Sequence, residues 1–330
     1  MNSSRTRVAE IFNAMRRDYD QISDLWYAWL FCRLHWLIVD RVIRLWRDPT
    51  QQRVLDIGCG TGFQTFLYAS VGAKVVGIDV AEALVQEAWD KAVNGRHIDG
   101  QNLFPAHFRF VEHYNKRIGT RLARWFPNRQ FVMPSFQLAS ADRLPYMDES
   151  FSHVNCCGSV LSFVDKYTTA FDEIRRVLRP GGTFILEVES KYNFDLIWPV
   201  LDATVLRGKL GYDTGLREAL VLWKSGLGQH VWMEYPFGNI ERPIHMNIRL
   251  FSRLGLKKEL CSRGLCPSRW WTIHSITNLI PSTLLDSPRP SKFLVRLFSW
   301  LARLEETLPF SLPGCSLVVF GAKRDRQVIA

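Results

Sequence analysis

Three glycines at alternate positions follow a short apolar run in the stretch VLDIGCGTG, residues 54–62. Residues 53–57 are predicted to form a buried strand, and residues 63–70 have the apolar spacing of a helix. The glycines therefore lie on a strand-to-helix turn, where a ligand can approach bare backbone and the N-terminus of a helix. This spacing predicts a nucleotide-like cofactor in contact with the turn.

Two acidic residues near this turn separate two classes of cofactor. Asp56 precedes the glycines, and Asp79 lies at the end of a second predicted strand, residues 74–80. A dinucleotide site has the spacing G-x-G-x-x-G, but Phe63 stands where the third glycine would be. An acid at position 56 would repel a pyrophosphate and can accept hydrogen bonds from an ammonium group, whereas Asp79 suits a ribose diol. The residues thus indicate a nucleoside with a cationic amino-acid tail.

These segments, VLDIGCGTGFQ and GAKVVGIDV, resemble the first two motifs of class I S-adenosylmethionine (SAM) methyltransferases. Two later segments agree with that family. Residues 139–151 are similar to the segment after its third strand, and AFDEIRRVLRPGG, residues 170–182, is similar to its "aLxEixRVLkPGG" pattern. Residues 8–20 resemble the start of the ubiquinone/menaquinone C-methyltransferases, in the methyltransferase type 11 group. The resemblance implies SAM as the cofactor.

The resemblance also implies a Rossmann-like α/β fold. We expect a seven-stranded, mostly parallel sheet with helices on both faces, plus a largely helical lid insertion. Residues 1–50 would form N-terminal cap helices, and residues 51–190 the SAM-binding core with a basic insertion at 91–134. Residues 191–310 would form the substrate lid, and residues 311–330 the closing strand of the sheet and a tail.

The same resemblance assigns further contacts with the cofactor. Tyr19 would cover the methionine end of SAM, and the Ala141 amide would face the adenine. Ser140 stands where the family usually has an aspartate beside the adenine amine, a role that a hydroxyl can also fill. The predicted cofactor-binding residues are Tyr19, Asp56, Gly58, Cys59, Gly60, Gly62, Asp79, Val80, Ser140, Ala141 and Cys157.

Methyl transfer from a sulfonium is an in-line displacement, and alignment of the reacting atoms can supply about 7–11 kcal/mol of the barrier. A dedicated base is therefore optional. Where the acceptor must lose a proton, the candidate catalytic residues are Glu189, His245 and His274, although each histidine also fits a hydrogen-bonded structural role. The seven cysteines are irregularly spaced and form no C-x-x-C pair, so we expect neither a disulfide framework nor a bound metal.

The acceptor is predicted from the segments around the site. Residues 25–47 and 291–306 each place basic side chains opposite apolar and aromatic ones. Such helices either roof an apolar site or lie in a membrane interface. The absence of an Asn/Asp-Pro-Pro-Tyr motif after the fourth strand argues against nucleic acid. We therefore expect a hydrophobic small molecule: a quinone-like ring, a natural product or a lipid.

The distribution of charge along the sequence is compatible with further binding partners. The net charge is +10, and residues 91–134 hold eight basic and two acidic residues. This segment could meet an anionic membrane or nucleic acid, or form a solvated face. With no signal sequence and no apolar stretch of membrane-spanning length, we expect a cytoplasmic protein, and peripheral contact with the inner face of a membrane stays an alternative.

Two other functions remain as alternatives. The first is a non-catalytic SAM-fold protein that docks on membranes or protein partners. The second is a nicotinamide-dependent reductase, which Phe63 disfavours. The sequence does not indicate an oligomeric state.

Overall fold

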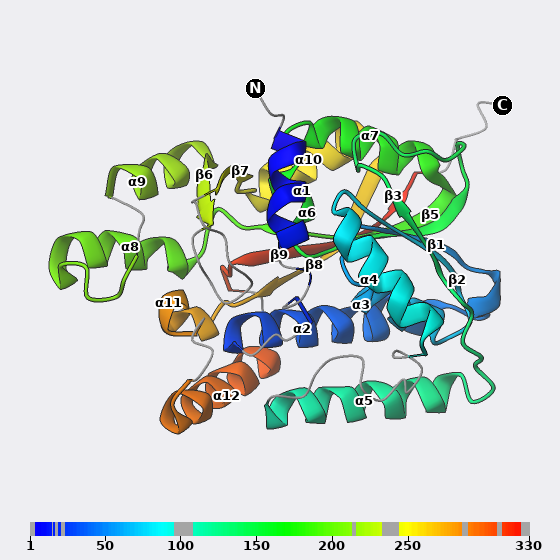
Figure 1. The fold of residues 1–330 in the computed structure, drawn as a ribbon, viewed down its shortest axis with the longest axis horizontal. Helices are drawn as coiled ribbons and strands as arrows, with labels where there is room; N and C mark the ends of the chain where they lie inside the picture. Colours follow the sequence, from blue (N-terminus) through cyan, green and yellow to red (C-terminus); the bar gives the residue numbers. More distant parts are fainter. Residues whose placement is uncertain are drawn as a thin grey trace.

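The computed structural model describes residues 4–14, 16, 19–20, 24–95, 108–212, 216–232, 244–285, 290–308 and 312–324. A seven-stranded sheet in the order β3-β2-β1-β4-β5-β9-β8 forms its centre (Figure 1). Strands β1 to β5 are parallel, and β9 is antiparallel to both of its neighbours. The strands are β1 (Arg53–Ile57), β2 (Lys74–Asp79), β3 (Ser135–Leu138), β4 (Phe151–Cys156), β5 (Leu178–Glu189), β8 (Leu265–Ile273) and β9 (Ser316–Lys323).

Helices cover both faces of this sheet, as Figure 1 shows. Alternate strand residues face opposite cores: Val54 and Ile185 contribute to one, Leu55 and Leu186 to the other. The first core also contains α2 (Leu25–Arg41), α3 (Phe63–Ala69), α5 (Arg109–Trp125) and α12 (Lys292–Thr307). The second contains α6 (Val160–Phe163), α7 (Tyr167–Val177) and α10 (Arg253–Ser262). The predicted sheet and its two helical layers are confirmed.

Helix α2 lies inside the protein. Its N-cap Asp24 accepts a hydrogen bond from the Tyr27 backbone N–H, and most of the helix is buried between the sheet and α5. The Trp29 side chain is 1% exposed, and Trp36 lies under the Arg117 guanidinium, 3.6 Å from the ring centre. The aromatic residues that could have faced a membrane therefore pack in the core. No helix among the described residues is long and apolar enough to cross a membrane.

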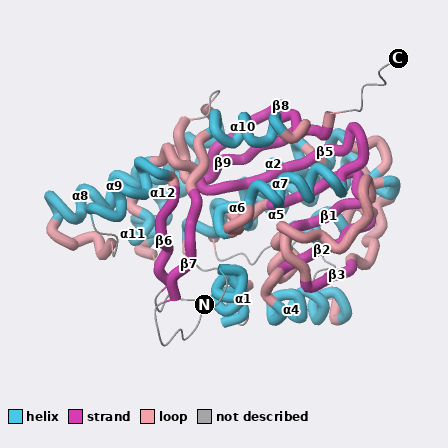
Figure 2. The backbone as a smooth tube through the Cα atoms, turned by 90° about the horizontal axis from the view of Figure 1, so that it is seen from above, coloured by secondary structure: helices cyan, strands magenta, loops and turns pink. Residues whose placement is uncertain are grey.

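The range predicted as a lid contains both peripheral and central elements. Its outer part comprises η3 (Phe194–Leu196), α8 (Ile197–Leu201), the π-helical η4 (Asp202–Leu206), α9 (Leu216–Ser225), the hairpin β6 (Leu227–Trp232) and β7 (Ile244–Arg249), and α11 (Ser282–Leu285). Both views place α8, α9, α11 and α12 at one end of the molecule (Figures 1 and 2).

Residues 253–273, by contrast, contribute α10 and β8 to the core. Strand β8 pairs with β9 at the edge of the sheet, and its register shifts between Pro267 and Arg269. An edge strand with a bulge and solvent on one side lacks the continuous apolar run of a central strand. The sequence pattern therefore did not distinguish it from the lid.

A buried carboxylate joins α12 to the rest of the fold. The two Glu305 oxygens accept hydrogen bonds from the backbone N–H groups of residues 274–277, at 2.9–3.2 Å. Glu305 Oε1 also accepts one from Trp29 Nε1 of α2, at 3.2 Å. One side chain thus connects α12, α2 and the segment that follows β8.

We expect Glu305→Ala to lower the free energy of unfolding by about 3 kcal/mol, because it leaves several buried N–H groups without an acceptor. Glu305→Gln, which keeps one carbonyl oxygen, should cost less. Urea unfolding measures both, with Arg303→Ala on the exposed side of the same helix as the control. A loss no greater than that of the control would contradict this role for Glu305.

Candidate cofactor and active site

A cavity of about 280 Å³ lies beyond the carboxyl ends of β1, β2 and β4. This is the position where open α/β sheets bind ligands. Its walls come from α1 (Ser4–Ala14), the turn after β1, the start of α4 (Glu82–Val93), the loop after β3 and the segment after β4. Six of the predicted cofactor-binding residues line it: Tyr19, Gly58, Asp79, Val80, Ser140 and Ala141.

The glycine turn is shaped by close packing and by backbone conformation. Gly58 has φ +72°, and a Cβ there would lie 2.1 Å from Val160 Cγ2 of α6. Gly60 has φ +53°, and its Cβ would lie 3.2 Å from the Tyr19 hydroxyl. Side chains at these positions would be strained by the positive φ and would displace their neighbours. The turn therefore presents the bare backbone of Gly58 to the cavity, and Gly60 allows Tyr19 to pack against the turn.

Asp79 joins the glycine turn to the next helix. Its Oδ2 accepts a hydrogen bond from Gly60 N, and its Oδ1 accepts one from Ala81 N, each at 2.9 Å. Burial raises the pKa of Asp79, while these backbone bonds oppose the rise. Each carboxylate oxygen can accept a further bond, so Asp79, which lines the cavity, suits a diol.

Asp56 lies beneath the turn rather than at the cavity. Its Oδ2 accepts from Thr65 Oγ1 at 2.5 Å, and its Oδ1 from Asn155 Nδ2 at 2.6 Å. Burial raises its pKa to about 6. The side chain points between α3 and β4, so this geometry joins those elements, and the contact with an ammonium group predicted for Asp56 stays a hypothesis.

Four other residues predicted to bind the cofactor are also not among the described residues that line the cavity. Gly60 and Gly62 shape the turn behind its surface, and a Cβ on Gly62 would lie 2.7 Å from the Phe66 ring. Cys59 packs in a small core with Phe66 and Phe136, and Cys157 belongs to the core around α2. These residues support the turn and the strands from inside.

The loop after β3 brings an acid that sequence analysis missed. Ser140 Oγ donates a 2.5 Å hydrogen bond to Asp142 Oδ1, and Ser140, Ala141 and Asp142 all line the cavity. The family's usual aspartate is absent at position 140, but a carboxylate two residues later reaches the same wall. The only sequence signal was the Asp142-Arg143 pair beside the expected position.

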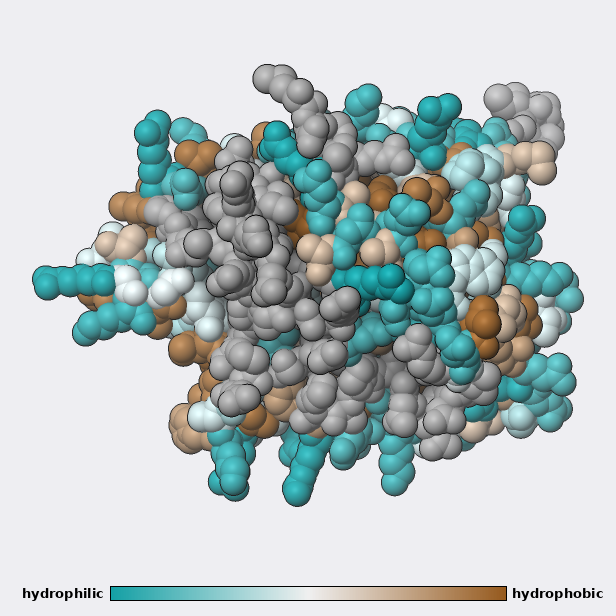
Figure 3. Space-filling model, viewed as in Figure 1, coloured by the Kyte–Doolittle hydropathy of each residue, from teal (hydrophilic) through white to brown (hydrophobic). Residues whose placement is uncertain are grey.

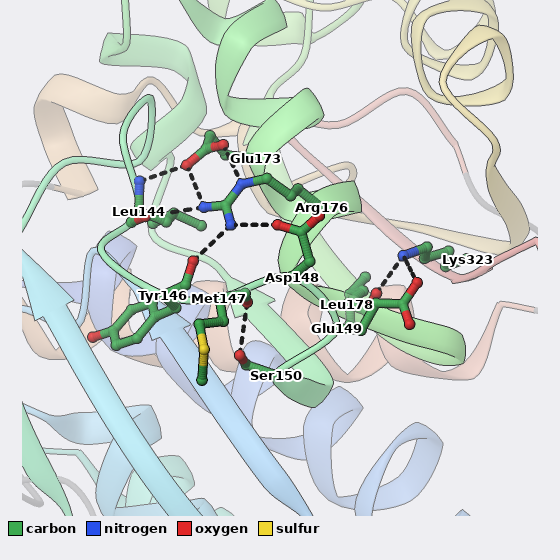
Figure 4. A network of polar contacts seen from close by, with 10 residues as sticks. All are labelled: Leu144, Tyr146, Met147, Asp148, Glu149, Ser150, Glu173, Arg176, Leu178 and Lys323. Atoms are coloured by element: carbon green, nitrogen blue, oxygen red, sulfur yellow. Dashed lines mark hydrogen bonds and ion pairs between the residues drawn. The ribbon is translucent and has the colours of Figure 1, made fainter.

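This loop is fastened to α7 by one guanidinium, shown in Figure 4. Arg176 donates to the backbone oxygens of Leu144 and Tyr146, at 3.0 and 2.6 Å, and to Asp148 Oδ1 at 2.9 Å. It also forms two bonds with Glu173, whose Oε2 accepts the Leu144 N–H at 2.7 Å. The Glu and Arg of the EIRRVL motif thus hold the loop that carries Ser140 and Asp142.

The N-terminal segment covers the cavity. Val8 and Phe12 of α1 and the Tyr19 ring form part of its wall. Asp20 Oδ1 accepts from Thr61 Oγ1 at 2.5 Å, and the Asp20 carboxylate forms an ion pair with Lys91. Asn13 Oδ1 accepts the Ala83 N–H at the start of α4, at 2.8 Å. Contacts with the glycine turn and with α4 therefore hold this cover in place.

Glu189 stands at the end of β5 in a group of carboxyls and hydroxyls. Its Oε1 accepts from Ser159 Oγ at 2.6 Å, and Glu187 Oε2 accepts the backbone N–H groups of Gly158 and Ser159 at 2.8 and 2.5 Å. Burial, and then the neighbouring Glu187, raise the pKa of Glu189. Gly158 lines the cavity, so this group adjoins the site.

The two candidate histidines lie elsewhere. His274 is buried and stacks on Trp26 with ring centres 3.7 Å apart. Its nitrogens contact Thr277 Oγ1 at 3.0 Å and the Trp26 backbone oxygen at 3.1 Å, which fits a structural role. Burial lowers its pKa to about 4. His245 pairs with Val231 in the β6–β7 hairpin, and its side chain lies outside the described part of the chain.

Two family models, each described as a methyltransferase domain, match consecutive parts of the chain, at residues 54–113 and 114–186. These parts include the glycine turn, Asp79, the loop after β3 and the Glu173–Arg176 pair. Residues 54–186 form a class I, SAM-dependent methyltransferase domain.

Comparisons with whole proteins show more distant similarities. A curated ubiquinone biosynthesis O-methyltransferase of Pasteurella multocida is 27% identical over 141 residues, or 42% of this chain and 53% of that protein. The chain thus matches about half the length of this relative. A solved SAM-dependent methyltransferase from Methanosarcina mazei is 16% identical, covering 86% of this chain and 95% of that one, with a TM-score of 0.48. The YcgJ protein from Bacillus subtilis is also 16% identical, covering 89% of this chain and 99% of that one, with a TM-score of 0.47.

The site fits SAM, the cofactor of this methyltransferase family. Gly58 exposes bare backbone at the cavity wall, and Asp79, which lines the same cavity, has two acceptor oxygens that a ribose diol could use. Asp142 and the Ala141 backbone would flank the adenine. The wall formed by Tyr19 would cover the methionine end.

We expect Asp79→Ala and Gly60→Leu each to weaken binding of S-adenosylhomocysteine by at least tenfold, about 1.4 kcal/mol. The first removes acceptors, and the second forces a side chain against Tyr19. Titration calorimetry measures both affinities.

Matched controls are Glu82→Gln, an exposed acid at the start of α4, and Gly208→Leu. Gly208 has φ +77° and no atom within 4 Å of its Cβ position, so it carries a similar backbone strain without the contact. Unchanged affinity in both site variants would refute this cofactor site.

Proposed function

We propose that this methyltransferase transfers the SAM methyl group to a hydrophobic small molecule, such as a quinone-like ring, a natural product or a lipid. Bound SAM would supply an electrophilic methyl group on a sulfonium. The protein's own part is to hold the nucleoside at the glycine turn and Asp79, to exclude water with the N-terminal cover, and to align the acceptor.

The apolar character of the space beyond the carboxyl ends of the strands carries this proposal. Phe12, Val160, Phe163 and Val164 line the cofactor cavity on its side nearest α1 and α6. A second cavity, of about 440 Å³, begins three residues after β5. Its walls are mainly the apolar side chains of Tyr192, Phe194, Leu196, Ile197, Val200, Leu220 and Trp223. Such walls suit an acceptor with apolar bulk.

Two further observations support this acceptor class. Lys166 is the one basic residue among the described residues that line the cofactor cavity, and the second cavity's described lining has none. A polyanionic nucleic acid would find few cations there. The curated relative of Pasteurella multocida is a ubiquinone biosynthesis O-methyltransferase, which favours a quinone-like acceptor.

Glu189 is the group we propose as proton acceptor where the substrate atom carries a proton. It adjoins Gly158 at the cavity wall through Ser159, and its hydrogen bond from Ser159 fixes its position. We propose a structural role for His274, since both of its ring nitrogens already have partners.

Incubation with methyl-labelled SAM and a lipid extract of the source cells tests the function. We expect label to appear in apolar products by mass spectrometry and to be lost with Asp79→Ala. Binding of S-adenosylhomocysteine without any labelled product would instead favour the alternative of a non-catalytic SAM-fold protein.

The rate should depend on pH through Glu189. A base must be deprotonated, so kcat/KM should fall as pH decreases through a pKa that lies above the usual value of 4.5 for a glutamate. Glu189→Gln should lower the rate about 10²-fold and remove this limb of the profile. Glu259→Gln, at a distant acid on α10, is the control. An unchanged profile in Glu189→Gln would exclude Glu189 as the base.

A further inference from the structure

Helix α12 exposes an apolar row on its outer side. The side chains of Phe293, Trp300 and Leu304 are 75%, 60% and 38% exposed. Their spacing of seven and four residues places them along one stripe of the helix. Large exposed aromatic side chains in a row are uncommon on a protein surface and indicate an interaction site.

Basic side chains run beside this row. Lys292, Arg296 and Arg303 are exposed and follow the same spacing on the adjoining stripe. The acids of α12 do not neutralise them: Glu305 is buried in its nest of N–H groups, and Glu306 pairs with Arg117 of α5 and Arg33 of α2. The outer surface of α12 thus combines aromatic side chains with positive charge that neither acid of this helix neutralises.

The burial of Glu305 sets the direction of this surface. Because Glu305 and Phe298 point inward, successive steps of 100° place Arg296 and Arg303 on the opposite side. Glu306 pairs with Arg117 of α5, so the edge of the basic stripe next to Glu306 faces α5. Phe293 and Trp300 lie on the other edge of the basic stripe, away from α5. The helix therefore cannot rotate its apolar row into the core without breaking the Glu305 contacts.

Helix α5 extends the positive charge. Its exposed Arg109, Lys116 and Arg124 are accompanied by a single exposed acid, Glu112, within this fully described helix. Figure 1 shows α5 and α12 along the same lower side of the molecule, and Figure 3 shows hydrophilic side chains projecting from that edge. We call the exposed residues of the two helices the α12–α5 face.

We propose that the α12–α5 face docks on the surface of an anionic lipid bilayer. Phe293, Trp300 and Leu304 enter the interfacial layer, and the basic side chains of both helices meet the headgroups. A bilayer matches both halves of this face at once, because its interface is apolar below and negatively charged above. A nucleic acid would match the charges but would leave Leu304 and Phe293 in water.

This docking would place the protein where an apolar acceptor is concentrated. The inference concerns binding alone, however, and its test needs neither SAM nor an acceptor. Failure of the docking and failure of the proposed function are therefore distinguishable.

Flotation of the full-length protein with vesicles tests the proposal. One set is phosphatidylcholine alone, and the other has a quarter of its lipid replaced by phosphatidylglycerol. We expect flotation with the anionic set only, and a marked decrease at high salt because exposed charges are screened. A lack of flotation with anionic vesicles would overturn the proposal.

Two triple variants separate the halves of the face. The apolar variant is Phe293→Ser, Trp300→Ser, Leu304→Ser, and the charge variant is Lys292→Gln, Arg296→Gln, Arg303→Gln. We expect each to lower the bound fraction roughly tenfold. Because these side chains are exposed, the melting temperature should stay near that of the wild type.

The matched control carries the same types of change on α10, whose outer side is also exposed: Leu254→Ser, Lys257→Gln, Lys258→Gln. It should float like the wild type. Equal flotation of all three variants would overturn the proposal. So would binding of a single-stranded RNA, or a dimer in sedimentation, that the face variants abolish while vesicles go unbound.

Discussion

The site depends on one carboxylate that ties the glycine turn to the end of the second strand. Asp79 accepts N–H groups from Gly60 and from Ala81, so the turn after β1 and the start of α4 share one acceptor. The glycines adopt the positive φ angles of this turn without strain, and the hydrogen bond from Gly60 N to Asp79 fixes the position of the turn. The other walls of the cofactor cavity come from α1, the loop after β3 and the segment after β4.

Much of this arrangement could be predicted from the sequence, because local rules dictate it. A strand, a turn that needs positive φ and an acid at the next strand end are close in the chain, and Gly58 and Asp79 do line the cavity. The position of Asp56 could not be read in this way. Whether its side chain faces a ligand or faces Thr65 and Asn155 depends on the packing of α3 and β4, which residues far along the chain determine.

The edge strand and the contacts between distant parts of the chain could not be predicted from the sequence pattern either. Strand β8 has a bulge and one solvent-facing side, so its residues show no clear hydrophobic periodicity. Asp142 reaches the cavity through a loop whose shape is set by Arg176, more than thirty residues later. Helix α2 looked amphipathic, but α5 and α12 cover its outer side and bury Trp29 and Trp36. In each case a tertiary contact overrode a local preference.

The cover formed by the N-terminal segment has a kinetic consequence. Tyr19 stacks near Phe63, and Asp20 is held by Thr61 and Lys91, so the wall over the cofactor is fastened to the turn beneath it. S-adenosylhomocysteine cannot leave, and SAM cannot enter, through this wall unless those contacts open. The rate at which this segment opens would then set the upper limit of the turnover rate. A protein without the segment would exchange its cofactor faster but bind it less tightly.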